Sequence, residues 1–298
     1  MRPPPPLSDR RVAFTTPEAY ARRLRRLLEL QGASPLWFPT VTTGPTPLTS
    51  ASLKRYLHRR RLQNPIPNEA LSLDSFSALA FTSRTGISAF SAALSAATPL
   101  PLSDKGEAFT VAALGRDAEL LDQAFLSKLC GNPNRIRVLV PEVASPGGLV
   151  DSLGPGLGRR VLCPVPLVVD LEEPPVVPDF LNDLELSGWV PVRVPAYETR
   201  WAGPGCAEGL VGLDGPAPDA VVFTSTAEVE GLLKGLRVIG WDWTALKARW
   251  QGMVTAAHGP VTASGAERLG VCVDIVGSRF GSFDGVVEAL ADEYAFFI

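Results

Sequence analysis

The chain has 298 residues, about twice a common domain length of roughly 150, so either two domains or one large domain is expected. Hydrophobic residues make up 46% and charged residues 20%, a mix that can bury a core without disulfides or metal. The formal net charge of −3 excludes a strongly basic, nucleic-acid-type surface for the chain as a whole. No apolar run approaches the roughly 18 residues of a membrane span, and the opening residues contain no apolar core of a signal peptide.

The cysteines and histidines are too few and too scattered for a metal site. The four cysteines are Cys130, Cys163, Cys206 and Cys272, and none forms a closely spaced pair. The chain has only 2 histidines. We therefore predict no metal site, and we expect buried thiols in a reducing compartment.

The first elements in chain order are a strand, a helix and a second strand. Val12–Phe14 is predicted as a strand, and Pro17–Leu30 as a helix that begins near proline and ends before glycine. The apolar residues of this helix lie on one side, and its arginines cover the rest as a solvated face. Pro35–Phe38 is the next predicted strand. The basic run Lys54–Arg61 is interpreted as another solvated helix face, with contact to an anion as the alternative.

An internal repeat organises the rest of the chain. Three segments recur in the same order at a nearly constant offset: LAFTSRTGISAF as VVFTSTAEVEGL, FTVAALGRDAEL as MVTAAHGPVTASGA, and LVPEVASPGGLVDSL as DIVGSRFGSFDGVVEAL. The segment Arg10–Pro39 also parallels Arg159–Pro195, whose copy carries a proline-rich insertion at Val165–Val177. The chain is therefore predicted to be α/β, with two similar doubly wound parallel-sheet (flavodoxin-like) domains.

The repeat places small polar residues where strands hand over to helices. These predicted turn residues are Thr82, Ser83, Thr224, Ser225, Gly115, Gly259, Ser145 and Ser282. In open parallel sheets such turns line the ligand crevice, and helix N-termini favour anions. We expect the two domains to enclose a pocket for a ligand with several carboxylates or phosphates. The alternative is that each hydroxyl only caps its own helix.

Several common catalytic motifs are missing from the sequence. There is no GxGxxG after a strand, no GxxxxGK[ST] and no GxSxG, so dinucleotide, P-loop and hydrolase chemistry are disfavoured. Neither histidine lies near an obvious nucleophile, which argues against a hydrolytic triad. His258 is interpreted as a structural or rim-lining residue.

An ordered set of short motifs resembles the uroporphyrinogen-III synthase family. The set is FTS (Phe81–Ser83), LGRDAE, RVL with its following Cys-Pro, PAYETRW (Pro195–Trp201), a second FTS, and HGPVTASGAERLG (His258–Gly270). Each motif is weak alone, but their order is specific. The resemblance extends over about Val12 to Ala291, almost the whole chain.

The resemblance implies a fold and a reaction. Residues 1–40 and 200–298 would form one domain and 45–195 the other, joined by a two-stranded linker near 39–44 and 195–201. The reaction would be the cyclisation of hydroxymethylbilane, a linear tetrapyrrole with eight carboxylates, with loss of water and inversion of the last ring. By the same resemblance, the reaction would need no metal or organic cofactor. The protein would then act by positioning and desolvation more than by a strong acid or base.

The resemblance also assigns residues. Tyr197 matches the family's linker tyrosine, a catalytic candidate to assist departure of the hydroxyl, because a phenol is protonated at neutral pH; a packed linker aromatic is the alternative. Thr262 matches the family's cleft threonine. The substrate-binding candidates are Thr15, Thr16, Thr82, Ser83, Gly115, Arg116, Ser145, Thr199, Thr224, Ser225, Gly259, Thr262 and Ser282.

Two positions depart from the family pattern. Thr15-Thr16-Pro17 stands where the family often has Thr-Arg-Pro, so the resemblance does not carry over the carboxylate contact of that arginine. Ala118 stands where the family often has a threonine, and Asp117 beside it would repel a carboxylate unless Arg116 offsets it.

Three functions remain open on the sequence. They are an active lyase, a non-catalytic tetrapyrrole- or anion-binding homologue, and an unrelated two-lobed protein that closes on a small polar ligand. The expected partner is a small molecule rather than nucleic acid or a membrane, and the expected state is a monomer. The expected location is the cytoplasm, or the plastid stroma if the source is a photosynthetic eukaryote.

Overall fold

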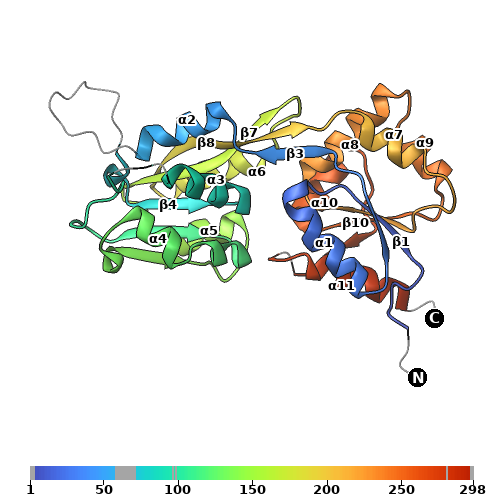
Figure 1. The fold of residues 1–298 in the computed structure, drawn as a ribbon, viewed down its shortest axis with the longest axis horizontal. Coiled ribbons are helices and arrows are strands. Elements are labelled where there is room, and N and C mark those ends of the chain that lie inside the picture. The colour runs from blue at the N-terminus through green and yellow to red at the C-terminus, as the bar shows by residue number, and fades with distance from the viewer. Residues whose placement is uncertain (1–3, 58–71, 96, 98, 280, 296–298) are drawn as a thin grey trace. The chain divides into compact units, whose positions relative to one another are not determined.

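The computed structural model describes residues 4–57, 72–95, 97, 99–279 and 281–295 (Figure 1). The chain forms two compact units. Unit 1 consists of Met1–Thr43, Val168–Pro174 and Thr199–Ile298, and unit 2 of Gly44–Leu167 and Pro175–Glu198. The expected two-domain α/β fold is confirmed, because each unit contains a sheet with parallel strands.

Unit 1 is built on a five-stranded sheet in the order β11-β10-β9-β1-β2. All of its neighbouring strands pair in parallel. The strands are β1 (Arg11–Phe14), β2 (Ser34–Trp37), β9 (Ala220–Phe223), β10 (Val254–Ala257) and β11 (Ile275–Val276). The chain proceeds outward in one direction from β1 and in the other from β9. The boundary between these two strands is therefore the topological switch point, where ligands bind in doubly wound sheets.

Helices cover both faces of this sheet. Leu24 and Leu28 of α1 are buried against Val12 and Phe14, together with α11. Ala13, Val221 and other alternate strand residues pack on the second group of helices. The helices are α1 (Glu18–Leu30), α7 (Gly205–Val211), α8 (Thr226–Val238), α9 (Trp243–Arg249), α10 (Pro260–Arg268) and α11 (Asp284–Ala295).

The second sheet has six strands in the order β3-β8-β7-β4-β5-β6. They are β3 (Val41–Gly44), β4 (Ala78–Phe81), β5 (Phe109–Ala113), β6 (Ile136–Leu139), β7 (Arg160–Val169) and β8 (Val190–Trp201). β4, β5, β6 and β7 pair in parallel. β3 and β8, which contain the two segments expected to link the domains, are neighbours in this sheet. The repeat makes β7, β8, β4, β5 and β6 the counterparts of β1, β2, β9, β10 and β11. The order β8-β7-β4-β5-β6 therefore matches the order β2-β1-β9-β10-β11 of unit 1, as the repeat predicts.

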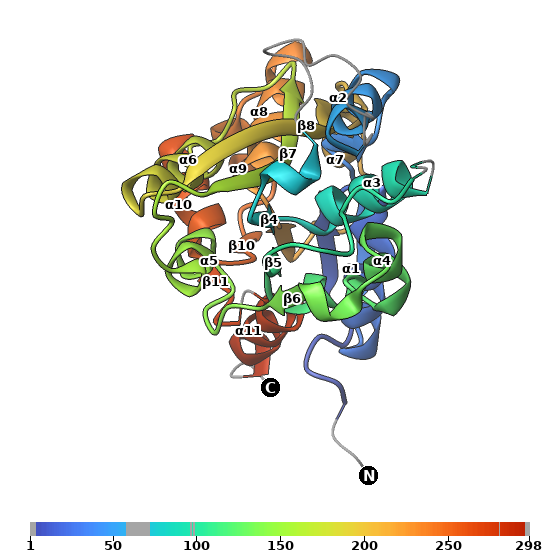
Figure 2. The same cartoon turned by 90° about the vertical axis from the view of Figure 1, so that its left-hand side faces the viewer.

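In unit 2, helices again cover both faces, as Figure 2 shows for α3 and α4 on one side and α5 and α6 on the other. Leu79 and Phe81 face α3 and α4, whereas Ala78 and Ala80 face α5 and α6. The helices are α2 (Pro47–Leu57), α3 (Arg84–Leu94), α4 (Gln123–Leu129), α5 (Pro146–Leu153) and α6 (Val176–Leu186). Lys54 and Arg55 lie in the last turn of α2, which ends at Leu57. The end of the basic run, His58–Arg61, lies outside the described residues.

The proline-rich insertion occupies an unexpected place. Its first residues continue β7 as far as Val169, and Val168–Pro174 groups with unit 1 although both flanks belong to unit 2. Inside unit 1, the Asp170 carboxylate pairs with Arg200 at 3.2 Å, and the Asp170 carbonyl accepts a bond from Lys234 at 2.5 Å. The middle of the insertion, Val168–Pro174, is therefore an anchored part of unit 1, whereas its two ends belong to unit 2.

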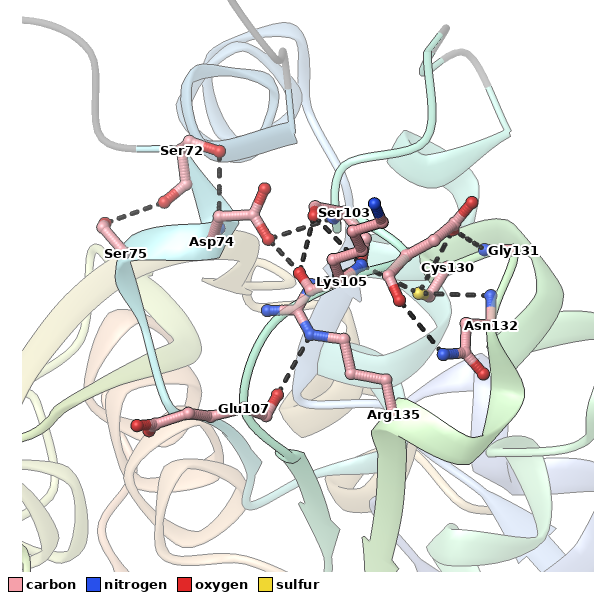
Figure 3. A network of polar contacts seen from close by, with 11 residues as sticks. Ser72, Asp74, Ser75, Ser103, Lys105, Glu107, Cys130, Gly131, Asn132 and Arg135 are labelled. Atoms are coloured by element: carbon pink, nitrogen blue, oxygen red, sulfur yellow. Dashed lines mark hydrogen bonds and ion pairs between the residues drawn. The ribbon is translucent and has the colours of Figure 1, made fainter.

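A buried arginine connects its own segment of unit 2 to two others, the 3₁₀ helix Leu73–Ser75 and the loop before β5 (Figure 3). Arg135 is 8% exposed and pairs with Asp74 at 2.9 Å. Its guanidinium also donates to the carbonyls of Ser103 and Glu107. Because these partners come from separate segments, Arg135 fixes the loop that precedes β5.

All four cysteines are free thiols. Cys130, Cys163 and Cys206 are buried, as expected, but the prediction is wrong for Cys272, which is exposed in the loop between α10 and β11. Burial raises the pKa of Cys206 to about 11.

Candidate functional site

The two Phe-Thr-Ser turns cap helices in different ways. Ser83 is the N-cap of α3, and its Oγ accepts a bond from the Gly86 amide at 3.1 Å. Ser225 is the N-cap of α8 but makes no side-chain bond to an amide. Instead its hydroxyl donates to the Glu228 carboxylate at 3.2 Å. The serines, rather than the preceding Thr82 and Thr224, are therefore the caps.

Glu228 is a buried carboxyl group at the switch point of unit 1. It is 1% exposed and accepts from the Thr15 hydroxyl at 2.7 Å and the Thr224 amide at 3.0 Å. The hydroxyls of Thr224 and Ser225 donate to its other oxygen. Desolvation by burial raises its pKa, and these bonds oppose that shift.

Two further threonines complete this cluster. The Thr16 and Thr224 hydroxyl oxygens are 3.4 Å apart, and Thr262 donates to the Thr224 carbonyl at 3.3 Å. The structure thus brings Thr15, Thr16, Thr224, Ser225 and Thr262 together at one place. Thr15, Thr16 and Thr262 are buried, so their hydroxyls serve the turn itself.

Unit 2 has its own polar pair at the equivalent turn. Tyr197 of β8 is 6% exposed, and its hydroxyl oxygen lies 2.8 Å from Ser83 Oγ. Ser83 Oγ also accepts a hydrogen bond from the Gly86 amide. This N-cap bond holds the Ser83 oxygen in place beside the Tyr197 hydroxyl. The catalytic candidate and one binding candidate are therefore in direct contact.

A second turn of unit 2 lies against the same helix end. Gly115 begins the 3₁₀ helix Gly115–Leu120 with φ of 45°, a left-handed conformation that glycine adopts easily. Asp117 in this turn lies 3.9 Å from Arg84, the first residue of α3. Arg116, expected to offset Asp117, lies at an exposed position. The Asp117 carboxylate thus has an arginine of α3 close to it, which the sequence did not indicate.

The remaining candidates are distributed over other turns. Ser145 caps α5 by accepting from the Gly148 amide at 3.1 Å, and Gly259 is the N-cap of α10. Ser282 donates to Asp284 at 2.6 Å just before α11. Thr199 lies buried in β8. Each is therefore placed at a turn or a strand by its local structure, and only Thr199 lies outside a helix start.

Sequence reasoning missed Glu228 and Arg84. A signal for Glu228 was present, because Ser225-Thr226-Ala227-Glu228 has the Ser-x-x-Glu spacing of a capping box. Arg84 followed a singled-out motif directly but carried no signal of its own. Within the described residues, no group of three or more His, Cys, Asp or Glu side chains could hold a metal ion, and no described helix is long and apolar enough to cross a bilayer.

Together these features define a duplicated, doubly wound α/β protein with hydroxyl-rich turns at the switch point of each sheet. Comparison with known proteins gives the family. A family model described as uroporphyrinogen-III synthase HemD matches residues 22–286. The chain belongs to the uroporphyrinogen-III synthase family, and is therefore an enzyme of tetrapyrrole synthesis.

The chain is similar to two solved structures, of which the first, with a TM-score above 0.5, shows the same fold. A mutant uroporphyrinogen III synthase from Thermus thermophilus matches with a TM-score of 0.52 at 20% identity, over 95% of this chain and 99% of the other. A uroporphyrinogen-III synthetase from Helicobacter pylori 26695 matches with a TM-score of 0.48 at 12% identity, over 95% and 99%. A search of curated protein sequences gives no match.

Proposed function

We propose that the protein cyclises hydroxymethylbilane to uroporphyrinogen III, with loss of water and inversion of the last ring, as a carbon–oxygen lyase. The match of the family model to residues 22–286 carries this proposal. It is supported by Tyr197, whose phenol is held by Ser83 in unit 2.

The local chemistry suits such a reaction. Loss of the substrate's hydroxyl group requires a proton donor, and the Tyr197 phenol can supply a hydrogen bond or a proton there. A buried aromatic also limits water near a cationic intermediate. The helix starts at Ser83, Ser145 and Gly259 present backbone N–H groups, which favour the substrate's carboxylates.

The test is to incubate the purified protein with freshly generated hydroxymethylbilane and to separate the product isomers by chromatography. We expect isomer III in excess of isomer I. Isomer I alone, as forms without protein, would contradict the proposal. The same preparation tests the expected monomer by gel filtration.

The Asp117 turn favours a second candidate, a tetrapyrrole-binding homologue without turnover. Asp117 places a negative charge 3.9 Å from Arg84, where a substrate carboxylate would otherwise find an unopposed cation. This alternative predicts quenching of porphyrin fluorescence on binding, with no isomer III, and equal binding by Tyr197→Phe.

A further inference from the structure

We propose that Glu228 is a positioning residue of the substrate site, whose buried carboxyl group fixes the turns after β1 and β9 in unit 1. This inference rests on the proposed function. Glu228 does not belong to any motif of the family resemblance, and it is fully buried, so it acts through the turns it holds.

The internal repeat isolates what Glu228 adds. Glu228 stands three residues after Ser225, as Gly86 stands three residues after Ser83. A Cβ on Gly86 would lie 3.3 Å from the carbonyl oxygen of Pro164, the residue that corresponds to Thr15 in the repeat. At this position of unit 2, a glycine therefore packs directly against the backbone of the neighbouring turn. In unit 1, a carboxyl group stands at the same position.

The hydrogen bonds of Glu228 join two segments that are distant in the sequence. One oxygen accepts from the Thr15 hydroxyl and the Thr224 amide, and the Thr15 hydroxyl also lies 3.3 Å from the Val222 carbonyl. The other oxygen accepts from the hydroxyls of Thr224 and Ser225. Without the carboxyl group, the Thr224 amide would lose its acceptor, and the turns after β1 and β9 would lose their bridge.

The same geometry separates a positioning role from a role of charge. In Glu228→Gln the amide oxygen can still accept from the Thr15 hydroxyl and the Thr224 amide. The NH2 group can donate to the hydroxyl oxygens of Thr224 and Ser225 once their hydrogens rotate. A protonated Glu228 would present the same pattern of one donor and one acceptor. Glutamine is therefore expected to preserve the turns, and alanine is not.

The experiment compares wild type, Glu228→Gln and Glu228→Ala in the isomer III assay. For Glu228→Ala we expect the KM for hydroxymethylbilane to rise about tenfold, with kcat much less affected, because the residue acts on binding turns. For Glu228→Gln we expect the KM to stay within about twofold of wild type. Glu230→Gln, on the same helix but outside this cluster, is the matched control and should leave the KM unchanged.

Hydrogen exchange gives a second measurement. The Thr224 amide should exchange faster in Glu228→Ala than in wild type or Glu228→Gln, because it loses its acceptor. If Glu228→Ala does not fold, Thr15→Val carries the test, since it removes the bridge from the β1 side and should raise the KM.

The outcomes distinguish the inference from the proposed function. If wild type forms isomer III and both Glu228 variants keep its KM, the positioning role is overturned and the function stands. If the glutamine variant loses as much as the alanine variant, charge rather than hydrogen bonding decides, and the inference is also overturned. If wild type forms no isomer III, the proposed function fails and the inference fails with it.

Discussion

The hydroxyl oxygens of Tyr197 and Ser83 lie 2.8 Å apart although 114 residues separate them in the chain. The contact joins a residue of the long strand β8 to the N-cap of α3. It places the phenol at the carboxyl end of β4, where parallel sheets bind their ligands.

Tyr197→Phe should therefore lower kcat for isomer III formation by at least about tenfold while leaving the fold intact. The ring keeps its buried packing, and the loss of one hydrogen bond costs about 1 kcal/mol of unfolding free energy. Steady-state kinetics and urea denaturation measure the two effects. Tyr56→Phe, whose ring packs on Phe76 in the same unit, is the control. An unchanged kcat would remove Tyr197 from the mechanism.

Asp117→Asn should lower the KM for hydroxymethylbilane by a few fold. The substitution removes the carboxylate that lies 3.9 Å from Arg84, so the guanidinium is left to attract a substrate carboxylate. Arg84→Ala should raise the KM, and the difference should shrink at high salt because the pair is partly exposed. Arg137→Ala, at an exposed position of β6, should leave the KM unchanged at both low and high salt. Equal KM values for all variants would place this turn outside the site.

The stability of the protein should depend on pH through Glu228. Burial raises the pKa of this carboxyl group above its ordinary value of 4.5, so the native state keeps a proton that the unfolded chain has already lost. The resulting stabilisation is complete below pH 4.5 and disappears as the pH rises through the native pKa. Urea denaturation across this range should show a decline in wild type relative to Glu228→Gln, which cannot titrate. Glu119→Gln, at an exposed position, should follow wild type.

Arg135→Ala should lower the unfolding free energy by about 3 kcal/mol. The substitution leaves Asp74 and two backbone carbonyls without the guanidinium that now joins them. Urea denaturation measures the loss, and Arg137→Ala in the same segment should cost less than about 0.5 kcal/mol. If the two variants were equally stable, Arg135 would not hold the loop before β5.

Much of the fold could be predicted because each element of the repeat has its own local sequence pattern. The strand and helix from Val12 to Leu30 follow from apolar spacing and from proline and glycine at the helix ends, and the structure confirms them as β1 and α1. The helix starts at Ser83 and Ser225 follow from the repeated Phe-Thr-Ser turn. The local pattern could not tell which hydroxyl of each turn is the cap.

The rest depends on contacts between distant segments. Glu228 is buried because β1 and β9 pair side by side, which brings Thr15 within 2.7 Å of a residue 213 positions away. The pairing of Asp117 with Arg84 likewise depends on how the 3₁₀ helix after β5 meets α3. The insertion after Val165 was visible as an insertion, but its grouping with unit 1 depends on Lys234 and Arg200, far along the chain.

This grouping determines how the protein can be dissected. A polypeptide made by fusing residues 1–43 to 199–298 would omit Val168–Pro174, and Lys234 and Arg200 would lose Asp170 as a partner. A fragment that keeps all contacts of unit 1 therefore needs three pieces of chain. The third piece, Val168–Pro174, would be added as a short peptide or a grafted loop.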